Sequence, residues 1–467
     1  MREGIFRYFS GGQRGRPGLN DSTDREGWLV LGSAWLVTLF LFILFQCVSP
    51  LLPILIIEFH LNHWMAGFLY SLPVLMLALF SYPLGAVSDR IGLEAAVGCG
   101  AIVAASSSLT RPLAMSYCIL ALSTAVFGLG FAMCFTNLPK LVKTNFPQRL
   151  AGTATGAYTT AIPLGAGLGI ALTKPILAAT GGWREVLMIW SLMAVPAIIL
   201  WWVVGGLTRK RRARFDPSSL HSGTVSQTAS QRIGRGDSAD PKPPLNHSSG
   251  RATQGPVSDI HRTYSPARLL GPVLLCGLLL LLLNYMFYST IGWLPTYLTE
   301  EGWDAASAAT ATSVISFVEI PAVLLIPMLS DRTGRRRLIL VLGFPLISIC
   351  STSLALNAGS SWFVAPVLGT TFGGIFALLL AMPVELVEQE KVASVAGAMI
   401  SIGYIGALTG PIITGYLRDL TGNFVVGFLV MALAGLVSVV LSFGISAVQP
   451  QRPANWAHES ERPPFSC

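Results

Sequence analysis

Long apolar segments, separated by short polar stretches, fill most of the chain. A helix needs about 20 apolar residues to cross the hydrocarbon core of a membrane, and segments of roughly that length recur almost from end to end. They are expected near residues 28–57, 64–84, 93–109, 114–138, 151–176, 184–206, 268–298, 305–329, 338–357, 362–384, 392–416 and 424–447. The pattern predicts an all-α integral membrane protein with twelve transmembrane helices.

Composition supports this interpretation and divides the chain. Of 467 residues, 52% are hydrophobic and only 12% are charged, whereas roughly a quarter are charged in soluble proteins. The first span lacks a cleavage site, so we expect a retained helix and not a signal peptide. The expected order is a cytoplasmic arm, a six-helix bundle, a linker, a second six-helix bundle and a cytoplasmic tail, at residues 1–27, 28–206, 207–266, 267–447 and 448–467.

The distribution of positive charge predicts the orientation. The chain has 31 Lys and Arg residues and a formal net charge of +8. With both ends in the cytoplasm, all but four of them lie inside, the exceptions being Arg111, Lys174, Arg184 and Arg418. This asymmetry follows the positive-inside rule and predicts a multi-pass protein of the inner (plasma) membrane. Topology and anionic lipid headgroups explain the positive excess, so membrane lipid is an expected partner and nucleic acid is not.

The segment 207–266 interrupts the apolar pattern. It opens with "TRKRRARFD" and continues through "DPKPPLNHSSG". A segment this polar and rich in Pro and Ser cannot bury a core, so we expect it to be disordered. Its basic start favours a stop signal for membrane insertion, with regulation or lipid binding as alternatives.

The two sides of this segment repeat each other. "PLGAVSDRIG" at 83–92 and "LIPMLSDRTGRRR" at 325–337 place Asp331, Arg332 and Gly334 at an offset of 242 from Asp89, Arg90 and Gly92. A second set recurs at an offset of 241, with Gly156, Gly165, Gly169, Thr180, Gly181 and Trp183 matching Gly397, Gly406, Gly410, Thr421, Gly422 and Phe424. The repeat predicts two bundles related by a pseudo-two-fold axis, an arrangement typical of transporters that bind solute between their halves.

The duplicated Asp-Arg turns are candidates for a conformational switch. Both are expected in cytoplasmic loops, at equivalent positions of the two halves. A carboxylate there can pair with a guanidinium, or with the exposed N–H groups of a helix from the other half, and so hold one conformation. The alternative is a plain structural anchor. The candidate switch residues are Gly85, Asp89, Arg90, Gly92, Asp331, Arg332, Gly334 and Arg335.

The pattern Gly-x-x-x-Asp-Arg-x-Gly at residues 85–92 resembles the signature loop of the major facilitator superfamily. A finer resemblance is to its cyanate and nitroimidazole transporter branch. It is carried by "SPLLPIL" (49–55), "IGLEAAV" (91–97), "LPKLVKTNFPQR" (138–149), "GAYTTAIPLGAGLG" (156–169), "GGWREVLMIW" (181–190), "FYSTIGWLP" (287–295) and "GYIGALTGPIITGYLRDLTG" (403–422). The resemblance implies two six-helix bundles that alternate access to a central cavity.

The chain departs from this branch at two positions. The resemblance implies an arginine in the first helix, seven residues before Ser49, where this chain has Phe42. It also implies a small or apolar residue where this chain has Glu319. The first difference removes the cation best suited to hold a small anion.

Polar residues inside predicted spans are candidates to contact the solute, because polar groups in membranes usually face the bundle interior or a water-filled path. Each could instead make a helix-to-helix hydrogen bond. The cavity candidates are Gln46, Tyr158, Thr159, Asn284, Tyr288 and Tyr404.

Glu319 is the most deeply placed acidic residue of the sequence. It lies 12 residues before Asp331, hence roughly 18 Å along the helix from the cytoplasmic end. A carboxyl group at that depth can gain and lose a proton as its surroundings change, which makes Glu319 the proton-coupling candidate. The alternative is a permanently neutral structural group. Lys174 and Arg184, at external helix ends, are expected to reach the headgroups or to attract an anion.

Other chemistry finds little support. The chain lacks a Gly-x-x-x-x-Gly-Lys-Ser/Thr nucleotide loop, and its histidines lack the spacing of a metal site. Most cysteines fall inside predicted spans, which favours buried apolar roles over disulfides. We therefore expect neither a cofactor nor a metal.

The sequence as a whole predicts a monomeric secondary active transporter, and not an enzyme, that moves a small solute by alternating access. Protons are the candidate coupling ion. The alternative is a non-transporting sensor that binds a ligand and signals through the linker. A membrane enzyme is less favoured, because no nucleophile, base and metal cluster together.

Overall fold

The computed structural model describes residues 20–214, 266–357, 359–386 and 389–445. Most of the expected N-terminal arm and linker, and the expected tail over 448–467, lie outside these residues. The described residues contain twelve helical stretches long and apolar enough to cross a membrane. The prediction of twelve transmembrane helices is therefore confirmed, and the protein is a multi-pass membrane protein.

The helices of the first half include several short pieces, because four of the spans are interrupted. In three of these spans a proline occupies the first turn of the next piece. Pro50 and Pro53 occupy the first turns of consecutive short helices, where a missing N–H costs nothing. In chain order the elements are α1 (Asn20–Gln46), η2 (Ser49–Leu51), α2 (Leu52–Glu58), α3 (His63–Ile91), α4 (Leu93–Thr110), η3 (Arg111–Leu113), α5 (Tyr117–Phe135), α6 (Leu138–Asn145), α7 (Gln148–Thr159), α8 (Ala161–Thr180) and α9 (Trp183–Arg214).

The second half is built from longer continuous helices. They are α10 (Pro266–Glu300), α11 (Ala305–Thr333), α12 (Arg336–Ala355), α13 (Ser361–Leu386), α14 (Gln389–Thr421) and α15 (Val425–Gly444). At the end of the first half, α9 continues past residue 206 into the range expected to be linker, because the Arg- and Lys-rich sequence there favours a helix.

The predicted repeat is visible in how the helices pack. In the first half α1 packs on α8, and in the second half α10 packs on α14. A Cβ added to Gly165 would lie 2.4 Å from the Leu39 carbonyl oxygen, and one added to Gly406 would lie 1.9 Å from that of Leu281. Leu39 and Leu281 are themselves 242 residues apart. The repeated glycines thus permit the same close helix contact in each half.

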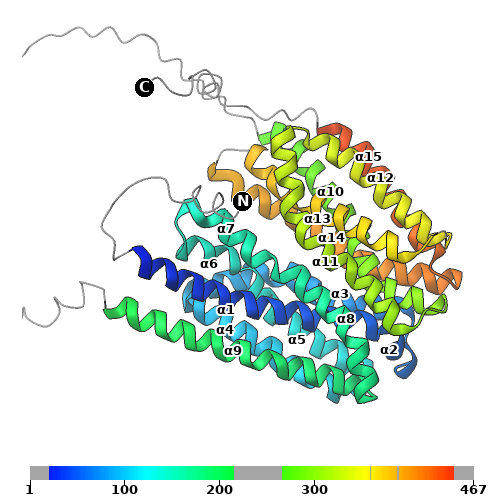
Figure 1. The fold of residues 1–467 in the computed structure, drawn as a ribbon, viewed down its shortest axis with the longest axis horizontal. Coiled ribbons are helices and arrows are strands. Elements are labelled where there is room, and N and C mark those ends of the chain that lie inside the picture. Colours follow the sequence, from blue (N-terminus) through cyan, green and yellow to red (C-terminus); the bar gives the residue numbers. More distant parts are fainter. Residues whose placement is uncertain (1–19, 215–265, 358, 387–388, 446–467) are drawn as a thin grey trace, which may run out of the picture.

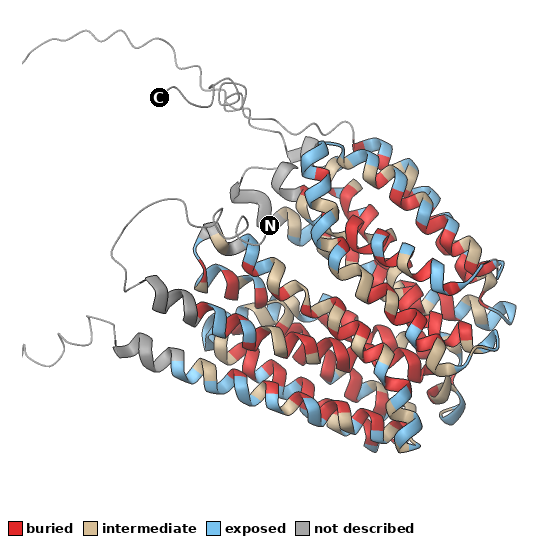
Figure 2. Ribbon diagram, viewed as in Figure 1, coloured by how far each residue is buried: buried red, intermediate tan, exposed pale blue. Residues whose placement is uncertain are grey.

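The two bundles lie side by side and approach each other most closely toward one end (Figure 1). The contacts between them are made mainly by α3 with α14 and by α8 with α11, and η2 also contacts α10. Buried residues fill the interior of each bundle, while the outer faces carry exposed side chains (Figure 2), as expected for helices whose apolar periphery faces lipid.

The glycines of the Asp-Arg turns end the helices that carry the motif. Gly92 follows α3 with φ of 89°, and Gly334 follows α11 with φ of 64°. Positive φ is open to glycine at little cost. The two turns share a glycine with positive φ but differ in ψ, which is 148° at Gly92 and 14° at Gly334.

Candidate functional site: a central cavity with one closed end

A cavity of about 250 Å³ lies between the two halves. It is lined from the first half by residues of α1, α3, α5, α6, α7 and α8, and from the second half by residues of α10, α11, α13 and α14. All six cavity candidates of the sequence analysis line it, together with Glu319. The structure thus brings together residues that are up to 358 positions apart in the chain.

Three of the polar lining residues also bond to neighbouring backbone or side chains. The Gln46 Oε1 accepts a hydrogen bond from the Tyr70 hydroxyl at 2.6 Å. The Asn284 Nδ2 donates to the Gly403 carbonyl at 3.1 Å, and the Thr159 hydroxyl donates to the carbonyl three residues earlier. Such bonds fix the orientation of the side chains and leave part of each group facing the cavity.

Aromatic rings form much of the cavity wall. Phe42 meets Phe131 edge to face, with centroids 5.3 Å apart, and Phe131 stacks on Phe135 at 5.6 Å. From the other half, Phe287 meets Phe372 edge to face at 5.4 Å. Phe42 thus places a ring in this wall at the position where the resemblance implied an arginine.

Glu319 lines the cavity from α11. Its carboxyl group makes no hydrogen bond or ion pair with any described residue, and no other described lining residue is an Asp, Glu, Lys, Arg or His. Gly373 on α13 makes room for it, since a Cβ there would lie 2.6 Å from the Glu319 Cγ. The equivalent position of the first half is Leu77, which lines the same cavity. Of these two equivalent positions, only the one in the second half carries a carboxyl group.

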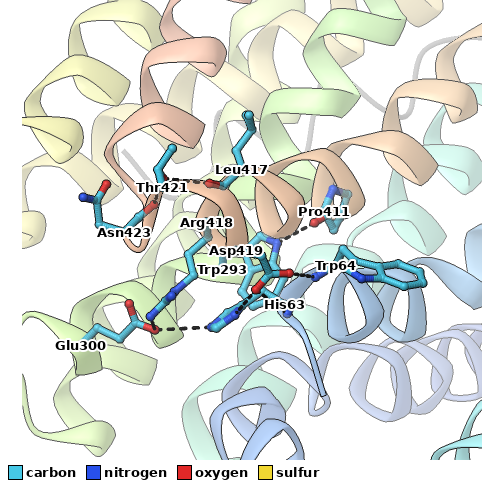
Figure 3. Close-up of polar contacts among 10 residues, drawn as sticks. All are labelled: His63, Trp64, Trp293, Glu300, Pro411, Leu417, Arg418, Asp419, Thr421 and Asn423. Carbon is cyan, nitrogen blue, oxygen red and sulfur yellow. Dashed lines mark hydrogen bonds and ion pairs between the residues drawn. The ribbon is translucent and has the colours of Figure 1, made fainter. Parts of the chain in front are cut away.

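Polar contacts join the two halves where the start of α3 meets the end of α14 (Figure 3). Asp419, near the end of α14, accepts hydrogen bonds from the backbone N–H groups of His63 and Trp64, both at 2.9 Å. Its Oδ1 also lies 2.7 Å from the His63 Nδ1. A carboxylate in this position satisfies unpaired N–H groups at the start of α3 and interacts favourably with the helix dipole.

Further contacts surround this pair. Glu300 lies 3.6 Å from the His63 Nε2 and 3.3 Å from the Arg418 Nη2. We call His63, Glu300, Arg418 and Asp419 the closing cluster. Each ring nitrogen of His63 thus faces a carboxylate of the other half. The buried Ser49 hydroxyl adds a cross-half hydrogen bond to the Ile291 carbonyl at 2.6 Å.

The local sequence pattern does not predict the closing cluster. The charge distribution predicts Arg418 outside, and the sequence gives no partner for Arg418 or for His63. The pairing depends on which turn of α3 faces which turn of α14, and neither residue belongs to the repeat: the positions equivalent to His63 and Asp419 are Ala305 and Ala178. The one available signal was a histidine at a helix start, opposite a predicted helix end carrying Arg-Asp.

Other basic residues at this end are also held within the protein. Arg111 is buried, donates to the Leu44 carbonyl at 3.0 Å and lies over the Phe127 ring. Arg184 forms an ion pair with Glu58 at 2.6 Å. Lys174 is buried within electrostatic range of Asp304, which belongs to the other half. Burial of Lys174 argues against a headgroup role for this residue. Arg184 pairs with Glu58 but 40% of its side chain is exposed, so its expected reach to the headgroups stays a prediction.

The Asp-Arg turns lie at the opposite end, and their carboxylates bond within their own halves. Asp89 pairs with Lys140 at 2.8 Å, and the same amino group lies 3.4 Å from the Gly85 carbonyl oxygen. Asp331 pairs with Arg336 at 2.5 Å. The remaining candidates, Arg90, Gly92, Arg332, Gly334 and Arg335, are exposed. The partner of Asp89 is an ammonium group and not the neighbouring guanidinium.

A family model described as "Major Facilitator Superfamily" matches residues 34–407, with a second match over 274–466. The chain belongs to the major facilitator superfamily. This confirms the resemblance drawn from the Asp-Arg turns, and with the twelve spans and the two bundles it confirms the predicted fold.

Relatives within the superfamily are distant. The chain is 27% identical over 396 residues to the uncharacterized transporter YycB of Bacillus subtilis (strain 168), covering 81% of this chain and 85% of the relative. It is 25% identical to the 2-nitroimidazole transporter of Escherichia coli (strain K12), covering 79% and 82%. It is also 25% identical to the cyanate transport protein of the same organism, covering 79% and 84%. These matches agree with the finer resemblance, and this superfamily member is a membrane transporter.

Solved structures support the same fold. A bacterial homologue of the human lysosomal transporter Spinster, in an inward-facing and occupied conformation, aligns with a TM-score of 0.68 at 14% identity, covering 91% of this chain and 98% of the other. At this identity the likeness concerns the fold alone.

Proposed function

We propose that the protein is a secondary active transporter that moves a small solute through the central cavity by alternating access. One observation carries the proposal: residues of both halves line a single cavity, and cross-half contacts join the halves at one end. Rocking the halves about the bound solute would open that end and close the other, which is the general mechanism of transporters built from two repeats.

The end with the Asp-Arg turns is proposed to face the cytoplasm. Lys and Arg concentrate there in the sequence, which is the arrangement that the positive-inside rule favours. Both termini would then be cytoplasmic and the membrane would be the inner (plasma) membrane. In this orientation the closing cluster faces outward, and the structure corresponds to an inward-facing state.

The two ends would exchange roles during transport. The closing cluster breaks when the outer end opens, which frees Asp419 and the start of α3 to bind water. At the inner end, Asp89 and Asp331 lie on exposed turns and pair within their own halves. In the outward-facing state these carboxylates would engage the opposite half, which is the switch role expected from their duplication.

Glu319 is proposed to couple transport to protons. A charged carboxylate without a partner is costly away from water, whereas a protonated one is tolerated. Glu319 has no bonding partner among the described residues and lines the cavity. It would therefore be neutral when the cavity is closed around it and would exchange its proton when water enters.

Proteoliposomes test the function and the coupling together. Flux of 2-nitroimidazole and of cyanate, the solutes named for two relatives, is measured with and without a pH gradient. Glu319→Gln keeps the size of the side chain and fixes it in a neutral form, so pH-driven accumulation should be lost while exchange of solute for solute continues. Glu301→Gln is the matched control, because Glu301 bonds Asn357 outside the cavity.

Two results would contradict these proposals separately. Unchanged pH-driven accumulation by the Glu319→Gln protein would show that Glu319 is structural. Ligand binding without flux of any bound solute would favour the sensor over the transporter.

A further inference from the structure

The charge content of the cavity restricts the solute it can take. Among the described lining residues Glu319 is the one ionisable acid, and basic side chains are absent. The rest of the wall is aromatic and aliphatic, with the amides of Gln46 and Asn284, the Thr159 hydroxyl and the hydroxyls of three tyrosines as polar groups. A solute must be stabilised by these groups when it leaves water.

An anionic solute fits this wall poorly. Moving a carboxylate-like ion away from water is very costly unless a cation or several donors compensate. The cavity offers no described cation, and aromatic ring faces carry negative potential that repels an anion. Phe42 and Phe131, whose rings meet edge to face at 5.3 Å, belong to this aromatic wall. An anion would also lie close to Glu319.

A cationic aromatic solute fits the same wall well. Ring faces attract cations, by about 2 kcal/mol or more when the pair is desolvated, and flat rings stack or pack edge to face on Phe and Tyr. The unpaired Glu319 carboxyl supplies the single countercharge. The volume of about 250 Å³ is slightly below the range of ligand pockets, roughly 300–1,000 Å³, so the solute should be small.

We infer that the solute is a small aromatic organic cation of one or two rings, and that it competes with a proton for Glu319. This inference rests on the proposed transport through the cavity and specifies its solute class. Proton and cation would occupy the carboxylate in turn, because one negative charge can neutralise only one of them. Transport would then exchange one for the other across the membrane.

The surroundings of Glu319 favour a simple competition. Tyr288 on α10 is within electrostatic range of Glu319 and of Tyr404, and Tyr158 lines the cavity from α7. Tyrosine hydroxyls ordinarily stay neutral near pH 7. On α13 the nearest groups are Gly373 and the apolar Phe372. No second described charge in the cavity wall would hide the effect of protonating Glu319.

The test uses three probes that share one ring and differ in charge: benzyltrimethylammonium, benzyl alcohol and benzoate. Their binding to the purified full-length protein is measured by titration calorimetry from pH 5 to pH 8. We expect the cation to bind at least about tenfold more tightly than the alcohol, and benzoate not to bind. Glu319→Gln should remove this preference, and Glu301→Gln should retain it.

Proton release provides a second measurement. Where Glu319 is protonated, cation binding should release up to about one proton, and cation affinity should fall by up to about tenfold for each unit of decreasing pH. The proton count is obtained by repeating the titration in two buffers with different ionisation enthalpies. Neither effect should occur in Glu319→Gln.

The outcomes separate this inference from the proposed function. Benzoate binding more tightly than the cation, cation binding unaffected by Glu319→Gln, or no cation binding at millimolar concentration would each overturn the inference. Flux of any other solute in proteoliposomes would then leave the transporter proposal standing. A third outcome is cation binding that is weakened by Glu319→Gln and by decreasing pH, without flux of the bound cation in proteoliposomes. It would support the solute class and contradict transport.

Discussion

The two ends of the molecule use carboxylates in different ways. At the closed end, Asp419 of the second half bonds to the start of α3 in the first half. At the opposite end, Asp89 bonds to Lys140 of its own half and remains largely exposed. An exposed ion pair contributes about 0–1 kcal/mol, whereas a carboxylate bonded to helix N–H groups satisfies donors that would otherwise lack partners. The conformation is therefore held mainly from one end.

The two ends also differ in whether their residues are repeated in the two halves. The Asp-Arg turns occur in both halves, with Asp89 and Asp331 at equivalent positions, but the closing cluster has no such symmetry, because alanines replace Asp419 and His63 at the equivalent positions. A duplicated ancestor explains the similarity of the two Asp-Arg turns. It does not explain the closing cluster, which depends on residues particular to each half.

The largest expected effect comes from removing the carboxylate of the closing cluster. Asp419→Ala leaves two backbone donors and His63 without their acceptor, at a cost of about 1–3 kcal/mol. The population open at the His63 end should increase by about tenfold or more. Distances between spin labels on the two halves, placed near this end, measure the change.

Glu301→Ala is the control for Asp419→Ala. It removes a carboxylate at the same end that bonds within its own half, to Asn357 at 3.0 Å. The distance distribution of this control should match that of the unmodified protein. If both variants open equally, the opening results from losing a carboxylate at this end in general, and the cross-half contact of Asp419 does not hold the end closed.

An intermediate effect is expected from Asp89→Asn, at the other end. The present conformation should hardly change, because the Asp89–Lys140 pair joins residues of one half. Flux should fall by about tenfold, since the outward-facing state would lose its cross-half contact, while ligand affinity stays within several-fold. Equal losses of folding, binding and flux would mark the turn as an anchor.

The smallest effect is expected from Lys140→Ala. This variant breaks the same ion pair from its basic side and leaves the Asp89 carboxylate free. Exposed pairs contribute about 0.2–1 kcal/mol, so flux should remain within about threefold of the unmodified protein. A loss as large as that of Asp89→Asn would show that Asp89 acts through Lys140, and not through the opposite half.

The sequence predicts those features that depend on local pattern. The spans follow from the length of the apolar segments, and the cavity candidates Gln46 and Asn284 from the cost of polarity in lipid. Gly165 and Gly406 stand out by their repeat, and the structure places them at close helix contacts.

Features that depend on the register between distant helices cannot be predicted from local sequence pattern. His63 and Asp419 meet because α3 and α14 pack in one particular alignment. The charge distribution predicts Arg111 at an external helix end but does not indicate its partners, which are the Leu44 carbonyl and the Phe127 ring. In both cases the partner is set by tertiary packing, which a single sequence does not encode in its local pattern.

The contact between α3 and α14 has a consequence for the speed of transport. Its tightest points are glycines: a Cβ on Gly67 would lie 2.3 Å from the Pro411 carbonyl oxygen, and one on Gly415 would lie 2.5 Å from that of His63. At these points backbone faces backbone, without side chains interlocked across the contact. Separating the helices there requires no rotamer changes, so the activation barrier to opening would come mainly from polar bonds that water can replace.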